Sequence, residues 1–114
     1  MSAESRSREI VYARSGGDCE ARIVGVCQGR GTNWHHRKNR SQGGLWRPSN
    51  GLHLCGSGTT GCHGWISHEP EKSFRKGWAV RSRFDPRDVA VCIGGRYVFL
   101  TDAGDYEELP PEAD

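Results

Sequence analysis

The chain is poor in apolar residues and contains no long hydrophobic run. Only 34% of its 114 residues are hydrophobic, whereas 16 are glycine. A membrane-spanning helix needs about 20 consecutive apolar residues, so we expect no membrane partner. A single domain of this size and composition buries only a small core. We therefore expect an additional source of stability, for which a bound metal is the natural candidate.

The first residues also lack an export signal, because Met1–Arg6 contains no apolar segment. We therefore expect a cytoplasmic protein in a reducing compartment. In such a compartment the five cysteines are more typical of a metal site than of disulfides. A disulfide framework and free thiols are the alternatives.

The two parts of the chain differ in charge. Residues 1–83 contain 14 Lys and Arg against 6 Asp and Glu, a net charge of +8, whereas residues 84–114 contain 2 against 8, a net charge of −6. The basic part holds every histidine and four of the five cysteines. A basic surface beside such residues favours a polyanionic partner, most simply nucleic acid. The alternative is an ordinary solvated surface.

The pattern of apolar residues and turn formers predicts short elements. Residues 1–8 are expected to be a frayed polar terminus, and residues 9–15 a helical turn or a strand. Two short strands are predicted over 32–37 and 52–55, separated by a basic, glycine-containing loop over 38–49.

Helical segments are predicted next. Thr59 or Thr60 is expected to cap a helix that begins near Cys62. Pro70 is expected to interrupt or restart this helix, and the helical pattern then continues to Gly77.

The C-terminal part has a different pattern. Two β-rich runs, 89–93 and 96–100, flank Gly94-Gly95 and predict a hairpin. Residues 101–114 are acidic, contain Pro110-Pro111 and are expected to be loose.

Histidine and asparagine follow a definite order along the predicted strand, loop, strand and helix. The motifs are His35-His36-Arg37, Arg40-Ser41-Gln42-Gly43-Gly44, Ser49-Asn50-Gly51-Leu52, Leu54-Cys55-Gly56 and Gly61-Cys62-His63-Gly64. They resemble the HNH endonuclease family, specifically its small phage-type members. The resemblance implies a small α+β fold with a ββα-metal (His-Me finger) core over 18–80. An extension over 1–17 precedes this core, and a C-terminal β-hairpin with an acidic tail over 81–114 follows it.

The resemblance also implies a role for each residue of the motif. His36 is the expected general base, which takes a proton from the attacking water. His35 and His63 are the expected ligands of a divalent metal (Mg, Mn, Ni or Zn) that stabilises the leaving 3′ oxygen of the DNA. Asn50 is expected to hydrogen-bond across the loop and hold the segment that carries the base. The products would carry 5′-phosphate and 3′-hydroxyl ends.

The chain departs from the family at one position. Many members carry a third ligand one helical turn after the last histidine, and position 67 is Ser67. His68 is the candidate replacement, although it lies about 140° around a regular helix from His63. Otherwise water would complete the metal site.

Four cysteines form a second expected site in this resemblance. The intervals between them are wider than in a zinc ribbon, but Cys55 ends a predicted strand and Cys62 begins a predicted helix. Four thiolates around a structural zinc ion, a four-cysteine zinc staple, would tie the N-terminal segment to the finger; they are Cys19, Cys27, Cys55 and Cys62. Cys92 is left over and is expected to be an inert core residue.

Basic residues crowd the loop between the two strands. Contacts with DNA phosphates or simple loop solubility would both explain them; they are Arg37, Lys38, Arg40 and Arg47. The four tryptophans are expected in the core, and His53 needs no functional role.

The expected function is therefore a metal-dependent DNA endonuclease. The alternative is a non-catalytic, zinc-stabilised module that binds nucleic acid. The phage-type resemblance further implies the cytoplasm of a host cell and a role beside the subunits of a DNA-packaging terminase.

Overall fold

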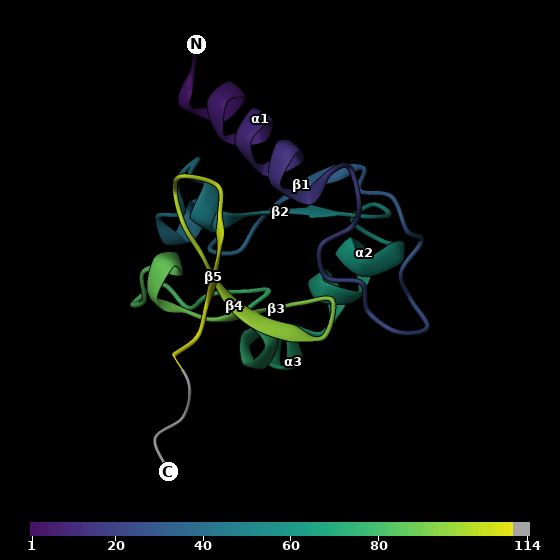
Figure 1. Ribbon diagram of the computed structural model, residues 1–114. Coiled ribbons are helices and arrows are strands. Elements are labelled where there is room, and N and C mark those ends of the chain that lie inside the picture. Colours follow the sequence, from purple (N-terminus) through teal and green to yellow (C-terminus); the bar gives the residue numbers. More distant parts are fainter. Residues whose placement is uncertain (111–114) are drawn as a thin grey trace.

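A computed structural model describes residues 1–110 of the chain as a small α+β fold with two antiparallel sheets. The elements in order are α1 (Ala3–Ser15), β1 (Asn33–His36), β2 (Gly51–Leu54), α2 (Gly61–His68), α3 (Pro70–Lys76), β3 (Val91–Ile93), β4 (Arg96–Leu100) and β5 (Tyr106–Glu108). Three single-turn 3₁₀ helices lie at Arg40–Gln42, Pro48–Asn50 and Pro86–Asp88. Figure 1 shows α1 above β1 and β2, with α3 and the three-stranded sheet below them.

The predicted pair of strands is present as β1 and β2. They pair antiparallel, with Trp34 opposite His53 and His35 opposite Leu52, and β2 begins one residue earlier than predicted. Successive side chains on a strand point to opposite faces. Trp34 and His36 therefore share one face of β1, and Asn33 and His35 share the other.

The helix predictions at α2 and α3 are confirmed. α2 begins after Thr60, whose carbonyl accepts the first hydrogen bond of the helix from the Gly64 N–H but whose hydroxyl makes no capping hydrogen bond. Glu69 separates the helices with an extended φ of −127°, because a residue before proline avoids the helical region. Pro70 then occupies the first turn of α3, and Gly77 ends it with a φ of 74°.

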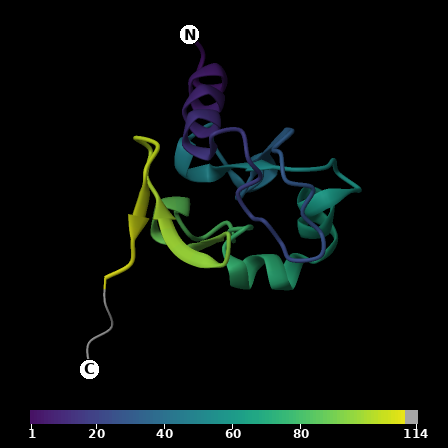
Figure 2. The same cartoon turned by 45° about the vertical axis from the view of Figure 1, so that its right-hand side comes forward.

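The predicted hairpin is confirmed as β3 and β4. Gly94 and Gly95 form its turn with φ values of 56° and 87°, which a side chain would disfavour. The segment after the hairpin was expected to be loose, but Tyr106–Glu108 pairs with β4 as strand β5. Figure 2 shows β5 at the edge of this sheet. The expectation also covered residues 111–114, which lie outside the described residues.

The prediction of a frayed N-terminus is wrong, because α1 begins at Ala3. The Ser2 hydroxyl accepts the N–H of Ser5 at the start of the helix, and Gly16 ends it with a φ of 65°. Among the apolar residues of α1 only Val11 is buried. A helix without a continuous apolar face gives no periodic signal, so the sequence pattern could not reveal it. None of the helices within residues 1–110 has the length and hydrophobicity needed to cross a membrane.

One hydrophobic core joins the two sheets. Leu52, Leu54 and Ile66 from the β1–β2–α2 region pack in the same cluster as Val98 and Leu100 of β4. The C-terminal hairpin therefore shares its core with the segment that carries the histidines.

A buried ion pair ties α1 to this core. Arg14 donates two hydrogen bonds of 2.8 Å to the carboxylate of Glu20, and both side chains are only 1% exposed. The same carboxylate accepts from the Tyr106 hydroxyl and from the His53 backbone N–H. Arg14 also donates to the carbonyl of Gly51. Residues from four parts of the chain thus meet at one buried charge pair.

We expect Glu20→Gln to lower the free energy of unfolding by about 3–5 kcal/mol, because Arg14 would be left as an uncompensated buried charge. Urea denaturation at a fixed zinc concentration measures this change. The matched control is Arg96→Gln, which breaks the exposed pair between Arg96 and Glu108 (64% and 68% exposed) and should cost about 1 kcal/mol or less. Equal losses in both variants would contradict a stabilising role for the buried pair.

Candidate functional site

Four cysteine sulfurs converge at one point between the loop after α1 and the start of α2. Cys19 and Cys27 lie in the loop after α1, Cys55 follows β2, and Cys62 lies in the first turn of α2. Their sulfur atoms all lie within 4.8 Å of one another. Sulfurs around a tetrahedral zinc ion would be about 3.8 Å apart for bonds of about 2.3 Å. The cluster is therefore suited to a structural metal such as zinc.

Backbone N–H groups surround the sulfurs. The N–H groups of Ile23, Gln28 and Gly29 point to Cys62, Cys55 and Cys27 at 3.3–3.4 Å. Such donors stabilise negative charge on sulfur, as outer-shell groups do around bound metals.

The close approach of the sulfurs also shifts the pKa values of their thiols. The Cys62 thiol donates toward Cys19 and lowers the pKa of Cys19 to about 5, while the same contact raises the pKa of Cys62. Burial and the neighbouring sulfurs raise the pKa of Cys27. Four thiolates this close together repel one another, and a bound cation removes that repulsion.

The alternative of a disulfide framework is not borne out. All five cysteines are free, and the sulfurs of Cys27 and Cys55 are 4.0 Å apart, about twice the length of a disulfide bond. Cys92 lies in β3, buried and outside the cluster, as expected.

We expect Cys27→Ser to lose the bound metal and the cooperative unfolding transition, because structural zinc binding supplies folding free energy in small domains. Elemental analysis of protein purified without chelator should find about one zinc ion per parent chain. Cys92→Ser is the matched control and should keep the metal. If the parent protein without metal still unfolds in a normal cooperative transition, the cysteines do not hold a metal that stabilises the fold.

Two histidines lie in edge-to-face contact at a separate pocket. His35 on β1 and His63 on α2 have ring centroids 5.4 Å apart, with ring planes inclined at 64°. They line a pocket of about 480 Å³ that is also bounded by Ser67 and Phe74. The antiparallel pair β1–β2 and the start of α2 therefore bring together two histidines that are 28 positions apart.

Hydrogen bonds fix the tautomer of both rings. His35 Nε2 donates to the Trp78 carbonyl at 2.7 Å, and His63 Nδ1 donates to the Asn33 side-chain oxygen at 3.1 Å. Within residues 1–110, His35 Nδ1 and His63 Nε2 make no hydrogen bond, so each ring keeps one free lone pair. Asn33 was missed by the sequence analysis, although its place two residues before His35 puts it on the same face of the strand.

Both rings are neutral at neutral pH. The pKa of His35 is lowered to about 4, mainly by burial, which outweighs the opposing effect of the Trp78 carbonyl; proximity to His63 and Arg37 acts in the same direction as burial. Burial likewise lowers the pKa of His63. A neutral imidazole is the form that binds metal or accepts a proton.

His68 does not join this pair. It is exposed at the end of α2 and does not line the pocket, and within residues 1–110 the four cysteines are the only cluster of three or more potential metal ligands. The structure thus places His68 apart from His35 and His63, contrary to its expected role as a third ligand. The reason is that α2 stays regular to its last residue, so a position five residues after His63 faces away.

The expected general base, His36, is half-buried; it lines the same pocket and packs against the rings of Trp34 and Trp46. Its Nδ1 accepts from the Trp34 indole N–H at 3.1 Å, and its ring lies 4.4 Å from that of Trp46. Burial lowers the pKa of His36, and the charges of Arg40 and Arg8 add to this effect.

Arg37 is not a surface residue, which corrects its predicted contact with phosphate. Its side chain is 2% exposed and donates to four backbone carbonyls, those of Gly77, Ser49, Pro86 and Val89. Burial lowers its pKa to about 9, so it stays charged at neutral pH. Arg37 therefore joins the loop after β1 to the segments that precede the hairpin.

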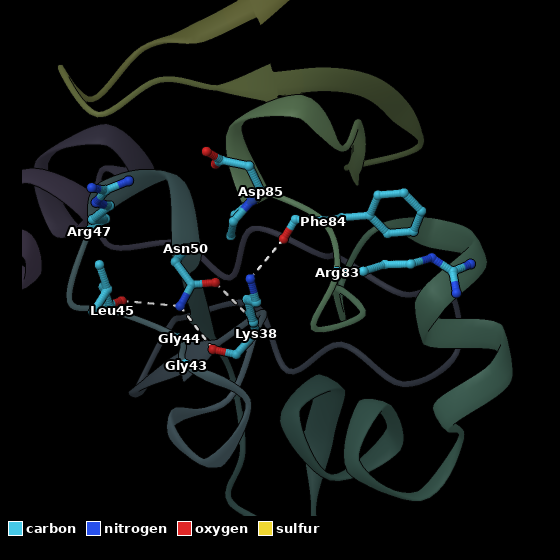
Figure 3. Close-up of a pocket in the computed structure, with 10 residues that line it drawn as sticks. Lys38, Gly43, Gly44, Leu45, Arg47, Asn50, Arg83, Phe84 and Asp85 are labelled. Carbon is cyan, nitrogen blue, oxygen red and sulfur yellow. Dashed lines mark hydrogen bonds between the residues drawn. The ribbon is translucent and has the colours of Figure 1, made fainter.

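Asn50 holds the basic loop from inside. Its amide donates to the carbonyls of Lys38 and Leu45 and accepts the Lys38 N–H (Figure 3). Lys38 lies at the edge of a neighbouring pocket and donates to the Phe84 carbonyl, while Arg40 and Arg47 are exposed. Three of the four predicted basic contacts are thus at or near the surface.

Comparisons of the chain with protein-family models, with curated proteins and with solved structures gave no match. The resemblance to HNH endonucleases therefore stays a prediction from the sequence motifs.

We expect the stability of the protein to fall between pH 6.5 and pH 4 in a way that depends on His35. The unfolded ring binds a proton in this window and the folded ring does not, so stability is full above pH 6.5 and decreases as the pH falls. His35→Asn should reduce this loss by at most about 3 kcal/mol. Urea midpoints of parent and variant across the window measure the difference, and parallel curves would contradict the lowered pKa.

Proposed function

We propose that this protein is a metal-dependent endonuclease of the HNH type that hydrolyses DNA phosphodiester bonds by nicking or cutting. The observation that carries the proposal is the pair His35 and His63. Both rings are neutral, both have one nitrogen committed to an oxygen acceptor, and both leave a lone pair free beside one pocket. Metal-binding histidines usually show this arrangement of a ligand nitrogen and an anchored N–H.

The donor set fits a divalent metal ion held by His35 and His63, with water completing the coordination. Such an ion would neutralise the phosphate and stabilise the leaving 3′ oxygen. The chain's own residues supply the other functions. Asn50 holds the loop that follows β1, and Arg40 and Arg47 are free to bind phosphate. In this proposal β1, β2 and α2 form the ββα-metal core, and His36 is the residue that removes a proton from the attacking water.

A second function is supported by a different observation. His35, His36 and His63 all line the pocket, but His36 Nδ1 already accepts from the Trp34 indole, and Ser67, at the usual third position, donates to the His63 carbonyl. The cysteine cluster is complete without that pocket. A zinc-stabilised module that binds nucleic acid without cleaving it is therefore the competing proposal. A terminase partner and the cytoplasm of a host cell stay predictions from the resemblance.

Supercoiled plasmid distinguishes the two proposals. After loosely bound ions are removed, the parent protein with added Mg, Mn, Ni or Zn should yield nicked or linear DNA with 5′-phosphate ends. His36→Ala and His63→Ala should each slow cleavage at least about 100-fold, the lower range for loss of an acid–base group or of a metal site.

His68→Ala is the matched control, since it removes an exposed imidazole from the same helix as His63, and it should cut like the parent. Undiminished cleavage by His36→Ala would remove His36 from the mechanism. Salt-sensitive DNA binding without cleavage under any metal would favour the non-catalytic module.

A further inference from the structure

His36 is held in a form that cannot act as a base. Because the Trp34 indole N–H donates to Nδ1, the neutral ring carries its proton on Nε2. That Nε2 is the one buried side-chain nitrogen or oxygen within residues 1–110 that has no hydrogen-bond partner. Neither nitrogen therefore offers a lone pair to a water molecule. An unpaired buried N–H is also unfavourable, so the arrangement needs support from elsewhere.

Trp46 stabilises this arrangement of His36, and contacts with α1 hold Trp46 in place. The Trp46 ring packs against His36 nearly edge-on, at 71°, and against Trp34. The Ser7 hydroxyl donates to the Trp46 carbonyl at 2.8 Å, and the Arg8 guanidinium lies 5.0 Å from the Trp46 ring. Two residues of α1 therefore hold Trp46 in place, and α1 lies outside the segment that resembles the HNH family.

A phosphate group can compete with Trp46 and Glu4 for the Arg8 guanidinium. Its side chain is 39% exposed and pairs with Glu4, which is 48% exposed. Exposed ion pairs and cation–π contacts of this kind are weak. A DNA phosphate makes a stronger, bidentate hydrogen-bonded pair with arginine. Arg40, whose charge also acts on His36, lies on the exposed surface of the basic loop.

We propose that Trp46 is a removable cover over His36 and that DNA phosphates binding Arg8 and Arg40 release it. Trp46 and Arg8 are then positioning residues: they act through His36 and keep it inactive until a polyanion is bound. The inference rests on the proposed nuclease function only for its biological purpose. The cover itself is a property of the free protein.

Diethyl pyrocarbonate, which acylates accessible unprotonated imidazoles, tests the cover without any cleavage. Modification of each histidine is followed by mass spectrometry in metal-supplemented buffer that keeps the cysteine site intact but lacks Mg and Mn. Exposed His68 serves as the internal reference in every sample. We expect Trp46→Ala to raise the rate at His36 severalfold relative to His68, and Trp46→Phe, which keeps a ring, to stay close to the parent.

Duplex DNA tests the release. Adding it to the parent protein should raise modification of His36, whereas Arg8→Gln should have a faster rate without DNA and no further response to DNA. Circular dichroism confirms that each variant is folded, and the surface change Arg8→Gln keeps the test valid if Trp46→Ala unfolds.

The two proposals fail differently. An unchanged His36 rate in folded Trp46→Ala would overturn the cover, even if the parent cuts DNA. A parent protein whose His36 becomes less reactive with DNA would overturn the release. Higher reactivity at His36 without cleavage under any metal would leave the cover standing and defeat the nuclease.

Discussion

The convergence of four cysteine sulfurs is the constraint on which the rest of the structure depends. The segment from Gly16 to Thr32 contains no helix or strand, and its ends are closed by a single isolated bridge between Asp18 and Arg30. Its position depends on Cys19 and Cys27, whose sulfurs meet those after β2 and in α2, and on Glu20, whose carboxylate and backbone bond to β2 and β5. Because a metal ion binds the folded arrangement and hardly the unfolded chain, it would supply the stability that a core of this size lacks.

The cysteine cluster also determines where the histidines lie. Cys62 is in the first turn of α2 and points to the cluster, so the next residue, His63, is turned about 100° around the helix and reaches His35. The same short segment thus serves both sites. A change at Cys62 would move His63, which couples the stability of the fold to the geometry of the pocket.

Two buried arginines hold separate segments of the chain together. The charge pattern of the sequence does not distinguish them from exposed basic residues. Arg14 and Glu20 join α1, β2 and β5, and Arg37, directly after β1, donates to carbonyls of the segments that precede β2 and β3. An arginine can be buried when its five N–H groups find carbonyl or carboxylate partners. In sequence, Arg37 is indistinguishable from the exposed basic residues beside it, and only its four carbonyl partners mark it as structural.

The sequence by itself determined the elements that depend on local chemistry. Turn glycines, Pro70 and the alternation of apolar residues act within a few positions, and they correctly predicted β1, β2, α2, α3 and the β3–β4 hairpin. Cysteine number, composition and position likewise indicated the cluster of four cysteines that the structure assembles. Only the tertiary structure decided that residues 3–15 form one continuous helix, that residues 106–108 add a strand, that His68 does not line the pocket and that Trp46 packs on His36. These features depend on contacts between residues far apart in sequence, such as Ser7 with Trp46, Arg14 with Gly51, and Tyr106 with Glu20. No local pattern encodes such partners, because their energy appears only when the chain is folded.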